Sequence, residues 1–351
     1  MIARTDNVSL RHALLAVVVM AVWGSNFVVI HFGLEHLPPL MFAALRFAFA
    51  LFPAVLFIRR PAVPWRNLAA SGVLIGAGQF GILYIAMNGQ ITPALASLVV
   101  QMQVFFTMAL ATYQDGERVR PFQWLALSIC IVGLALIMLR TDASTTPLGL
   151  VLVLVAALCW AGGNMVIRRT PDADMLGYVV WASLFSIPPL LAGSFLLEGR
   201  TAIAHGFAHA DLTTAAAVAW QAVGNTLFGY AVWGWLLSRY PVAAIAPMSL
   251  LVPVFGIAAS ALWLGEPLQS WKLQATALVL IGLFINLICG RSSPQRAVPG
   301  ATRARPYSQG RLPTHAGRPG SVTPSAGVER QRTTNSSGIA MDQVTPCGAN
   351  S

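Results

Sequence analysis

An arginine and an asparagine lie inside consecutive apolar stretches of this sequence, where polar side chains are costly. These residues are Arg46 and Asn26. An arginine near the centre of a membrane helix costs about 2.5 to 3.5 kcal/mol on insertion scales. A guanidinium at that depth can hold a carboxylate or phosphate through two parallel hydrogen bonds. We expect Arg46 and Asn26 to bind a substrate; the alternative is that Arg46 bonds Asn26 and backbone carbonyls and only ties helices together.

Amide side chains in other apolar runs are further candidates for substrate contact. Gln79 lies in the third apolar run, Gln101 and Gln103 lie in the fourth, and Asn164 lies in the sixth. Because Gln101 and Gln103 are two residues apart, they cannot share one helical face, and Gln101 is the one we expect to face a central cavity. The alternative for each amide is a hydrogen bond between helices, worth about 0.6 kcal/mol on average.

Two tryptophans stand beside these polar positions. Trp23 precedes Asn26 by three residues, and Trp160 precedes Asn164 by four. We expect both rings to flank the substrate. The alternative is the interfacial belt or simple packing in which most membrane tryptophans are found.

The sequence offers little for other chemistry. His205 and His209 have a possible metal spacing with Asp211 after them, but no third strong ligand is fixed in place, so we expect no metal. Signatures of nucleotide or dinucleotide binding are absent from the sequence, so we expect no cofactor and no enzyme. Every Asp and Glu falls in a loop or at a predicted helix end. Any proton coupling would therefore use Glu117, Glu266, a histidine or the substrate.

Composition places these residues in a membrane protein. The chain is 56% hydrophobic and 10% charged, against about 25% charged in soluble domains. The net charge of +10 is largely carried by arginines near the C-terminus. We therefore expect a lipid bilayer and a small-molecule substrate as partners, and no nucleic acid. The four cysteines show no paired pattern and predict no disulfide.

Apolar runs of membrane-spanning length recur along the chain. A hydrocarbon core about 30 Å thick needs roughly 20 residues per helix. We therefore predict an all-α integral membrane protein with ten transmembrane helices, the first of them retained and not cleaved as a signal peptide. The predicted helices cover residues 12–31, 39–58, 67–87, 93–113, 121–139, 148–167, 176–197, 214–237, 242–264 and 271–290.

The positions of Arg and Lys predict the orientation. Cytoplasmic loops carry an excess of both residues. One set of helix ends carries many arginines, whereas the other set carries only Arg140, Arg200 and Lys272. Both termini are therefore predicted to be cytoplasmic, as an even number of helices requires.

Two halves of the chain carry matching motifs. Residues 23–26 correspond to 160–164, and residues 96–100, with an acid beyond them, correspond to 248–252. We predict two five-helix repeats, at 8–141 and 146–290. Because five is odd, the second repeat must run inverted. Inverted repeats recur in secondary transporters, which bind substrate near the midplane between the halves.

Residues 291–351 have a different composition. They are rich in Arg, Pro, Ser, Thr and Gly and poor in large apolar side chains. Such a segment cannot bury enough surface to offset the entropy of ordering. We predict a disordered tail that is dispensable; the alternative is contact with anionic lipids.

The residues above also carry a resemblance to a known family. Over residues 8–290 the sequence resembles the EamA-type transporters of the drug/metabolite transporter superfamily, and within them the bacterial O-acetylserine/cysteine exporters. The segments that carry the resemblance are residues 23–29, 45–47, 79–80, 95–99, 116–118, 160–164 and 250–254, and toward the exporters residues 36–41 and 246–253. The resemblance implies a ten-helix bacterial inner-membrane fold and efflux of small metabolites.

Together these observations predict an exporter of small amino-acid-like metabolites of the O-acetylserine/cysteine class that works by alternating access. A broader drug or nucleotide-linked metabolite carrier is the alternative within the same fold. A membrane-embedded enzyme or a non-transporting scaffold is the alternative outside it. An enzyme would need a nucleophile or metal constellation at membrane depth, and a scaffold would need neither the repeat nor a buried arginine.

Overall fold

A computed structural model describes residues 9–115, 121–140, 145–170, 173–240 and 245–291. Every element in these ranges is a helix. The predicted tail at 291–351 lies outside them, except for Arg291. The predicted positions of both termini and of Glu117 also lie outside the described residues.

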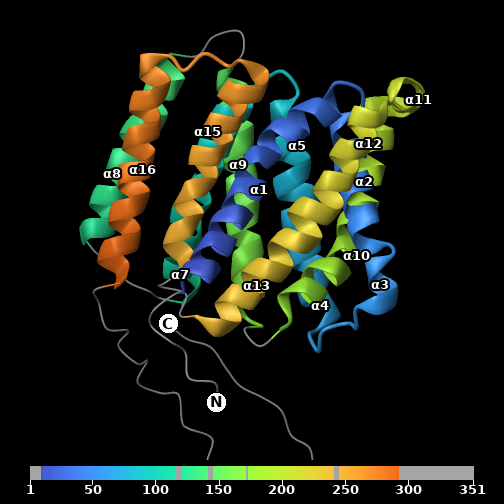
Figure 1. The fold of residues 1–351 in the computed structure, drawn as a ribbon, viewed down its shortest axis with the longest axis horizontal. Coiled ribbons are helices and arrows are strands. Elements are labelled where there is room, and N and C mark those ends of the chain that lie inside the picture. Colours follow the sequence, from blue (N-terminus) through green and yellow to red (C-terminus); the bar gives the residue numbers. More distant parts are fainter. Residues whose placement is uncertain (1–8, 116–120, 141–144, 171–172, 241–244, 292–351) are drawn as a thin grey trace, which may run out of the picture. The chain divides into compact units, whose positions relative to one another are not determined.

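The first half of the chain forms five helical stretches, several of them built from consecutive elements (Figure 1). Their bounds are α1 (Leu10–Leu34); α2 (Pro39–Leu51) and α3 (Ala54–Phe57); α4 (Trp65–Ser71), η1 (Gly72–Gly81) and α5 (Ile82–Met87); α6 (Pro93–Val99), η2 (Val100–Met102) and α7 (Gln103–Asp115); and α8 (Pro121–Leu139).

The second half forms five more. Their bounds are α9 (Pro147–Arg168); α10 (Met175–Gly193), η3 (Ser194–Glu198) and α11 (Gly199–His209); α12 (Leu212–Ala219), η4 (Trp220–Phe228) and α13 (Gly229–Arg239); η5 (Ala246–Leu250) and α15 (Leu251–Leu264); and α16 (Ser270–Arg291). The segments η1, η3 and η4 are π-helical, whereas η2 and η5 are 3₁₀ helices.

The helical stretches overlap all ten predicted runs. Seven of them are long and apolar enough to cross a membrane, and Met248–Leu264 and Ser270–Asn286 are shorter apolar helices. The protein is therefore a multi-pass membrane protein, while ten crossings remain a prediction. The seventh predicted helix ends at residue 197, within one residue of the end of η3 at Glu198, where Gly199 takes a positive φ of 81° that breaks the helix. The helix α11 that follows was not predicted from the sequence.

Side-chain caps explain where several helices begin. Ser, Thr and Asp favour the position before a helix because their oxygens accept a backbone N–H that lacks a helical partner. Ser9, Thr92, Thr146, Asp174 and Asp211 do so at the starts of α1, α6, α9, α10 and α12. The residues before these helices thus contribute to where each helix starts.

Helices of the two halves pack in a repeating pattern. α2 packs against α10 and α8 against α16, so elements at matching positions meet each other. α1 packs against α15, and the matching pair, α9 and α7, also pack together. A two-fold relation between two repeats would produce this pattern. The pattern supports the inverted repeat, which remains a prediction.

Glycine allows a close approach between helices at two positions of η1. A Cβ on Gly72 would lie 2.2 Å from the carbonyl oxygen of Ala182, and one on Gly76 would lie 2.0 Å from Oγ of Ser186. Gly72 and Gly76 therefore permit close packing of η1 against α10, next to the candidate site.

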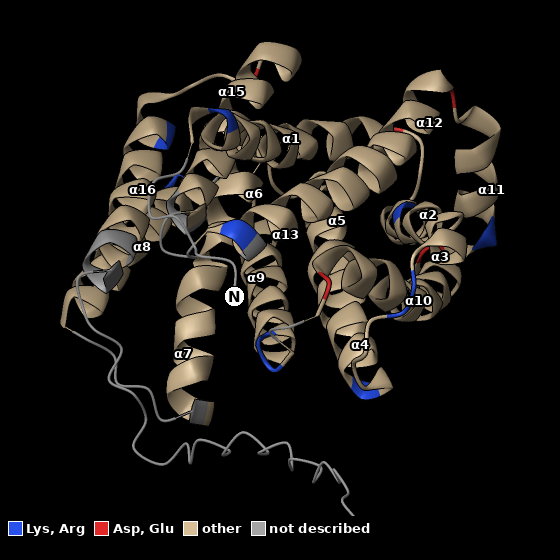
Figure 2. Ribbon diagram, turned by 60° about the horizontal axis from the view of Figure 1, so that its bottom comes forward, with Lys and Arg blue, Asp and Glu red and all other residues tan. Residues whose placement is uncertain are grey.

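Basic residues gather at one end of the helices. Arg66 lies in α4, Arg168 ends α9 and Arg239 ends α13, and Figure 2 shows blue segments at this end, which it brings forward. Following the predicted orientation, we name this the inner end. We name the end formed by residues 35–38 and α11 the outer end.

Candidate substrate site

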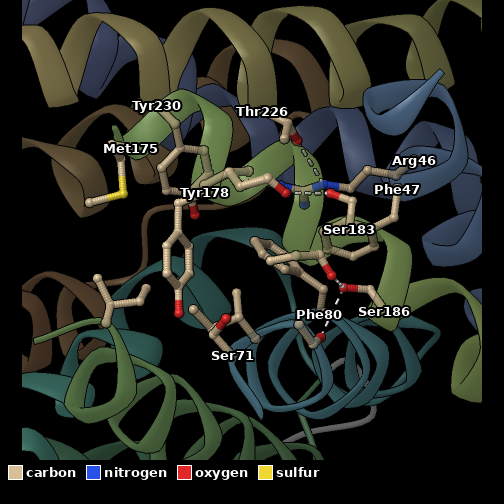
Figure 3. Close-up of a pocket in the computed structure, with 16 residues that line it drawn as sticks. Arg46, Phe47, Ser71, Phe80, Met175, Tyr178, Ser183, Ser186, Thr226 and Tyr230 are labelled. Carbon is tan, nitrogen blue, oxygen red and sulfur yellow. Dashed lines mark hydrogen bonds between the residues drawn. The ribbon is translucent and has the colours of Figure 1, made fainter. Parts of the chain in front are cut away.

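Arg46 of α2 is fully buried, and its side chain points toward Thr226 (Figure 3). Its Nε donates a hydrogen bond to Oγ1 of Thr226 at 3.2 Å, and its Nη1 donates to the Tyr84 hydroxyl at 3.3 Å. Its Nη2 has no hydrogen-bond partner among the described residues. Neither partner is Asn26, so the predicted Arg46–Asn26 tie is not present.

Aromatic rings cover the guanidinium. The guanidinium carbon lies 3.7 Å from the ring centre of Phe80 and 5.2 Å from that of Phe47. Such cation–π contacts contribute about 2 kcal/mol when desolvated. Within the described ranges no acidic side chain forms an ion pair with Arg46. Its positive charge is therefore available to an anionic group.

A small cavity lies beside Arg46. Its volume is about 40 Å³, enough for a few water molecules, whereas ligand pockets usually measure about 300 to 1,000 Å³. The structure is therefore closed around Arg46, and a molecule larger than a few waters would need helix movement to enter. The lining residues come from α2, α4, η1, α9, α10, η4 and α13.

Hydroxyl groups are the other polar groups on this lining. Ser71, Ser183 and Ser186 donate to the backbone carbonyls of Leu68, Val179 and Gly72, at 3.1, 2.8 and 2.9 Å. Because each donor is already used, the remaining hydroxyl lone pairs can accept hydrogen bonds. The lining thus combines a cation with several acceptors.

Trp23 does not line the cavity but contacts Tyr230, which does. Its ring centre lies 5.4 Å from that of Tyr230, which lines the cavity, and 5.6 Å from that of Trp233. Its Nε1 donates to the carbonyl oxygen of Asn225 at 3.1 Å. Asn26 is also buried, and its Oδ1 has no hydrogen-bond partner in the described part of the chain.

The remaining predicted residues lie away from the cavity lining. Gln79 and Gln101 are buried, and Oε1 of Gln79 is unpartnered within the described residues. Asn164 donates to Oε1 of Gln103 at 3.0 Å, and Trp160 is half-buried against the core. Asn164 therefore makes the hydrogen bond between helices that was its alternative role. Of the seven predicted site residues, Arg46 alone lines the cavity.

A face of α10 that the sequence analysis did not select forms one wall. Its cavity-lining residues are Met175, Tyr178, Val179, Ala182, Ser183 and Ser186. Their spacing of three, one, three, one and three is the helical repeat of one face. This helical spacing is present in the sequence. Serines and small residues are common in apolar helices, however, whereas a charged residue there is rare and stands out.

This chain is similar to known proteins over most of its length. The sequence profile of the EamA-like transporter family matches residues 10–139 and again 147–288. A probable amino-acid metabolite efflux pump of Salmonella typhimurium is 40% identical over 286 residues, which cover 80% of this chain and 95% of that protein. Its Escherichia coli K12 namesake is 38% identical over the same shares.

Two more distant similarities are to a relative described as an exporter and to a solved structure. A probable terminal-alkyne amino-acid exporter of Streptantibioticus cattleyicolor is 25% identical over 77% of this chain and 91% of its own. One solved crystal structure is similar in fold, with a TM-score of 0.57 and 17% identity, over 81% of this chain and 99% of the other. Given the family profile in both halves and the 40% identity, the chain belongs to the EamA-like transporter family.

Proposed function

We propose that this protein exports small amino-acid-like metabolites across the bacterial inner membrane. The observation that carries the proposal is a fully buried Arg46 with one free nitrogen, Nη2, and no acidic partner among the described residues. A desolvated guanidinium without a counterion favours a carboxylate or another anion, which it can bind through two hydrogen bonds.

The hydroxyl groups on the cavity lining favour a zwitterionic substrate. An amino acid has a carboxylate for Arg46 and an ammonium group that needs hydrogen-bond acceptors. Ser71, Ser183 and Ser186 supply such acceptors, because their own protons are donated to backbone carbonyls. The small volume of the closed cavity, about 40 Å³, favours a metabolite with a small side chain once the helices move apart.

The names of similar proteins point to the same substrate class. Two relatives are described as probable amino-acid metabolite efflux pumps and a third as a probable terminal-alkyne amino-acid exporter. The O-acetylserine/cysteine class is our more specific proposal, and it rests on the sequence resemblance described above.

Transport by alternating access would follow from the closed cavity and the paired halves. A site with a volume of about 40 Å³ must open to one side at a time. Two five-helix repeats, at 8–141 and 146–290, can rock about such a site. We place both termini in the cytoplasm, because the arginines gather at the inner end. In the other states of this cycle, Trp23, Asn26, Gln79, Gln101, Asn164 and Trp160 would complete the site.

Export by intact cells tests the proposal. Overexpression in bacteria fed cysteine precursors should raise extracellular O-acetylserine and thiol. Arg46→Ala should abolish this rise, and Arg46→Lys should reduce it, because an ammonium lacks the planar fork. Membrane abundance of each variant is the control. An unchanged medium despite normal insertion would contradict the amino-acid assignment, and loss of the protein from the membrane would make Arg46 a structural tie.

Truncation after Arg291 tests the tail separately. We propose that residues 292–351 are dispensable, so the truncated protein should export at the full rate. Loss of export with normal membrane abundance would instead support a role such as binding anionic lipids.

A further inference from the structure

Glu198 joins two helices at the outer end. It is the last residue of η3, and its carboxylate accepts backbone hydrogen bonds from the first turn of α2. Oε1 lies 2.6 Å from the N of Leu40, and Oε2 lies 3.2 Å from the N of Met41. The Ser194 hydroxyl also donates to Oε2, at 2.5 Å. The carboxylate is thus held by three donors.

These contacts replace a local cap. α2 begins after Pro38, which makes no side-chain capping hydrogen bond. The first N–H groups of a helix lack helical partners and carry partial positive charge. A carboxylate 158 residues away in the sequence supplies the missing acceptor. The start of α2 therefore depends on its contact with η3.

The same helix carries Arg46. Six residues separate Leu40 from Arg46, which corresponds to about 9 Å along a helix. Between them, Phe42 and Ala43 are fully buried. Movement of the start of α2 away from η3 would open this buried stretch toward the arginine.

Water reaches the carboxylate from the outer end. An open pocket of about 680 Å³ is lined by Glu198 together with His36 and His205. The α1–α2 connection is tied a second time, because Nδ1 of His36 lies 2.9 Å from Oγ1 of Thr214. The pocket thus borders the contacts that close the protein between the outer end and Arg46.

We propose that Glu198 is the latch of the outer gate: its carboxylate holds the start of α2 against η3 and closes the path between Arg46 and the outer pocket. The inference rests on the proposed function, since a gate has meaning only in a transporter. Glu198 acts through α2 and is a positioning residue that does not touch the substrate.

The charge of the carboxylate strengthens this latch. A neutral group at position 198 lacks the charge that strengthens hydrogen bonds from N–H groups and that favours a helix N-terminus. Removing this charge should therefore weaken the hold on α2 and open the gate.

Cysteine labelling in intact cells tests the latch without any substrate. Ala43→Cys places a thiol beneath it, and a membrane-impermeant maleimide is added outside. Adding Glu198→Gln, which keeps the shape but removes the charge, should raise the labelling rate several-fold. Thr201→Cys, at an exposed position beside the pocket, is the control and should label equally in both backgrounds.

Two further controls separate the latch from other causes. The unsubstituted protein measures labelling of its native cysteines. His205→Gln, which changes another residue of the same pocket, should leave the labelling rate unchanged. Equal labelling of Ala43→Cys with and without Glu198→Gln, at normal membrane abundance, would overturn the proposal. Because no export is measured, that result would leave the amino-acid assignment intact.

Discussion

The hydroxyl of Thr226 links Arg46 to a π-helical turn. Its oxygen accepts from Nε of Arg46 at 3.2 Å, while its own proton goes to the carbonyl oxygen of Gln221 at 2.8 Å. That carbonyl lies five residues earlier in η4, and π-helical turns are frequent at functional sites. Thr226 therefore sets the direction in which the guanidinium points.

Thr226→Val removes this acceptor while keeping the side-chain shape. A hydrogen bond to a charged group contributes about 1.5 to 3 kcal/mol, so the KM for export should rise roughly tenfold or more. Thr226→Ser keeps the hydroxyl and should export nearly normally. Export measured against internal substrate concentration checks both variants. A Thr226→Val protein with an unchanged KM would show that Tyr84 alone orients Arg46.

Gly24 and Gly162 lie in matching motifs but differ in the space around them. A Cβ on Gly24 would lie 2.5 Å from the carbonyl oxygen of Val252 and 2.9 Å from the N of Gly256, both rigid backbone atoms. Gly24→Ala should therefore destabilise the protein by about 1 to 3 kcal/mol through overpacking.

Gly162→Ala is the matched control for Gly24→Ala. Its Cβ would meet only the flexible end of Leu74, at 3.5 Å. Since glycine within a helix is less stable than alanine by about 0.5 to 1 kcal/mol, this variant should be neutral or slightly more stable. Thermal unfolding midpoints in detergent compare the two. Equal midpoints would refute close packing of α1 on α15 at Gly24.

Lys272 and Glu266 form an ion pair shielded from water at the start of α16. Their Nζ–Oε1 distance is 2.8 Å, and Ser260 hydrogen-bonds the other carboxylate oxygen. Removing one partner of a buried pair typically costs about 3 to 5 kcal/mol, because the other charge stays uncompensated. Lys272→Met should therefore lower the unfolding midpoint strongly. Adding Glu266→Gln should recover part of the loss; a double variant less stable than Lys272→Met would argue against charge as the cause.

Asp211 gives the protein a pH dependence at the outer end. The backbone N–H of Thr214, 2.8 Å from Oδ1, is the main cause that lowers the pKa of the Asp211 carboxyl, followed by the Thr214 hydroxyl. Because the folded pKa lies below the unfolded one, its contribution to stability is present above the unfolded value of about 3.9. It is lost as the pH falls through the lower folded value.

Asp211→Asn isolates this effect, since an amide can still cap α12 but does not titrate in this range. The difference in unfolding midpoint between the two proteins should shrink as the pH falls below about 4. Parallel curves throughout the acidic range would show that the Asp211 charge does not stabilise the start of α12.

The sequence by itself determined the membrane class and the places of the helices. Apolar runs of about 20 residues must form helices in a bilayer, because backbone polar groups there can be satisfied only internally. It also identified Arg46, because a charge at that depth is costly wherever the helices pack. These conclusions need only the local chemistry of the chain.

Only the tertiary structure decided which side chains Arg46 meets and what closes the site. Thr226 is 180 residues from Arg46 in the sequence, and Glu198 is 158 residues from the α2 backbone that it caps. Such partners depend on which helices pack together, and many apolar helix faces are nearly equivalent in a bilayer. For the same reason, six of the seven predicted site residues lie off the cavity lining, while the face of α10 forms its wall.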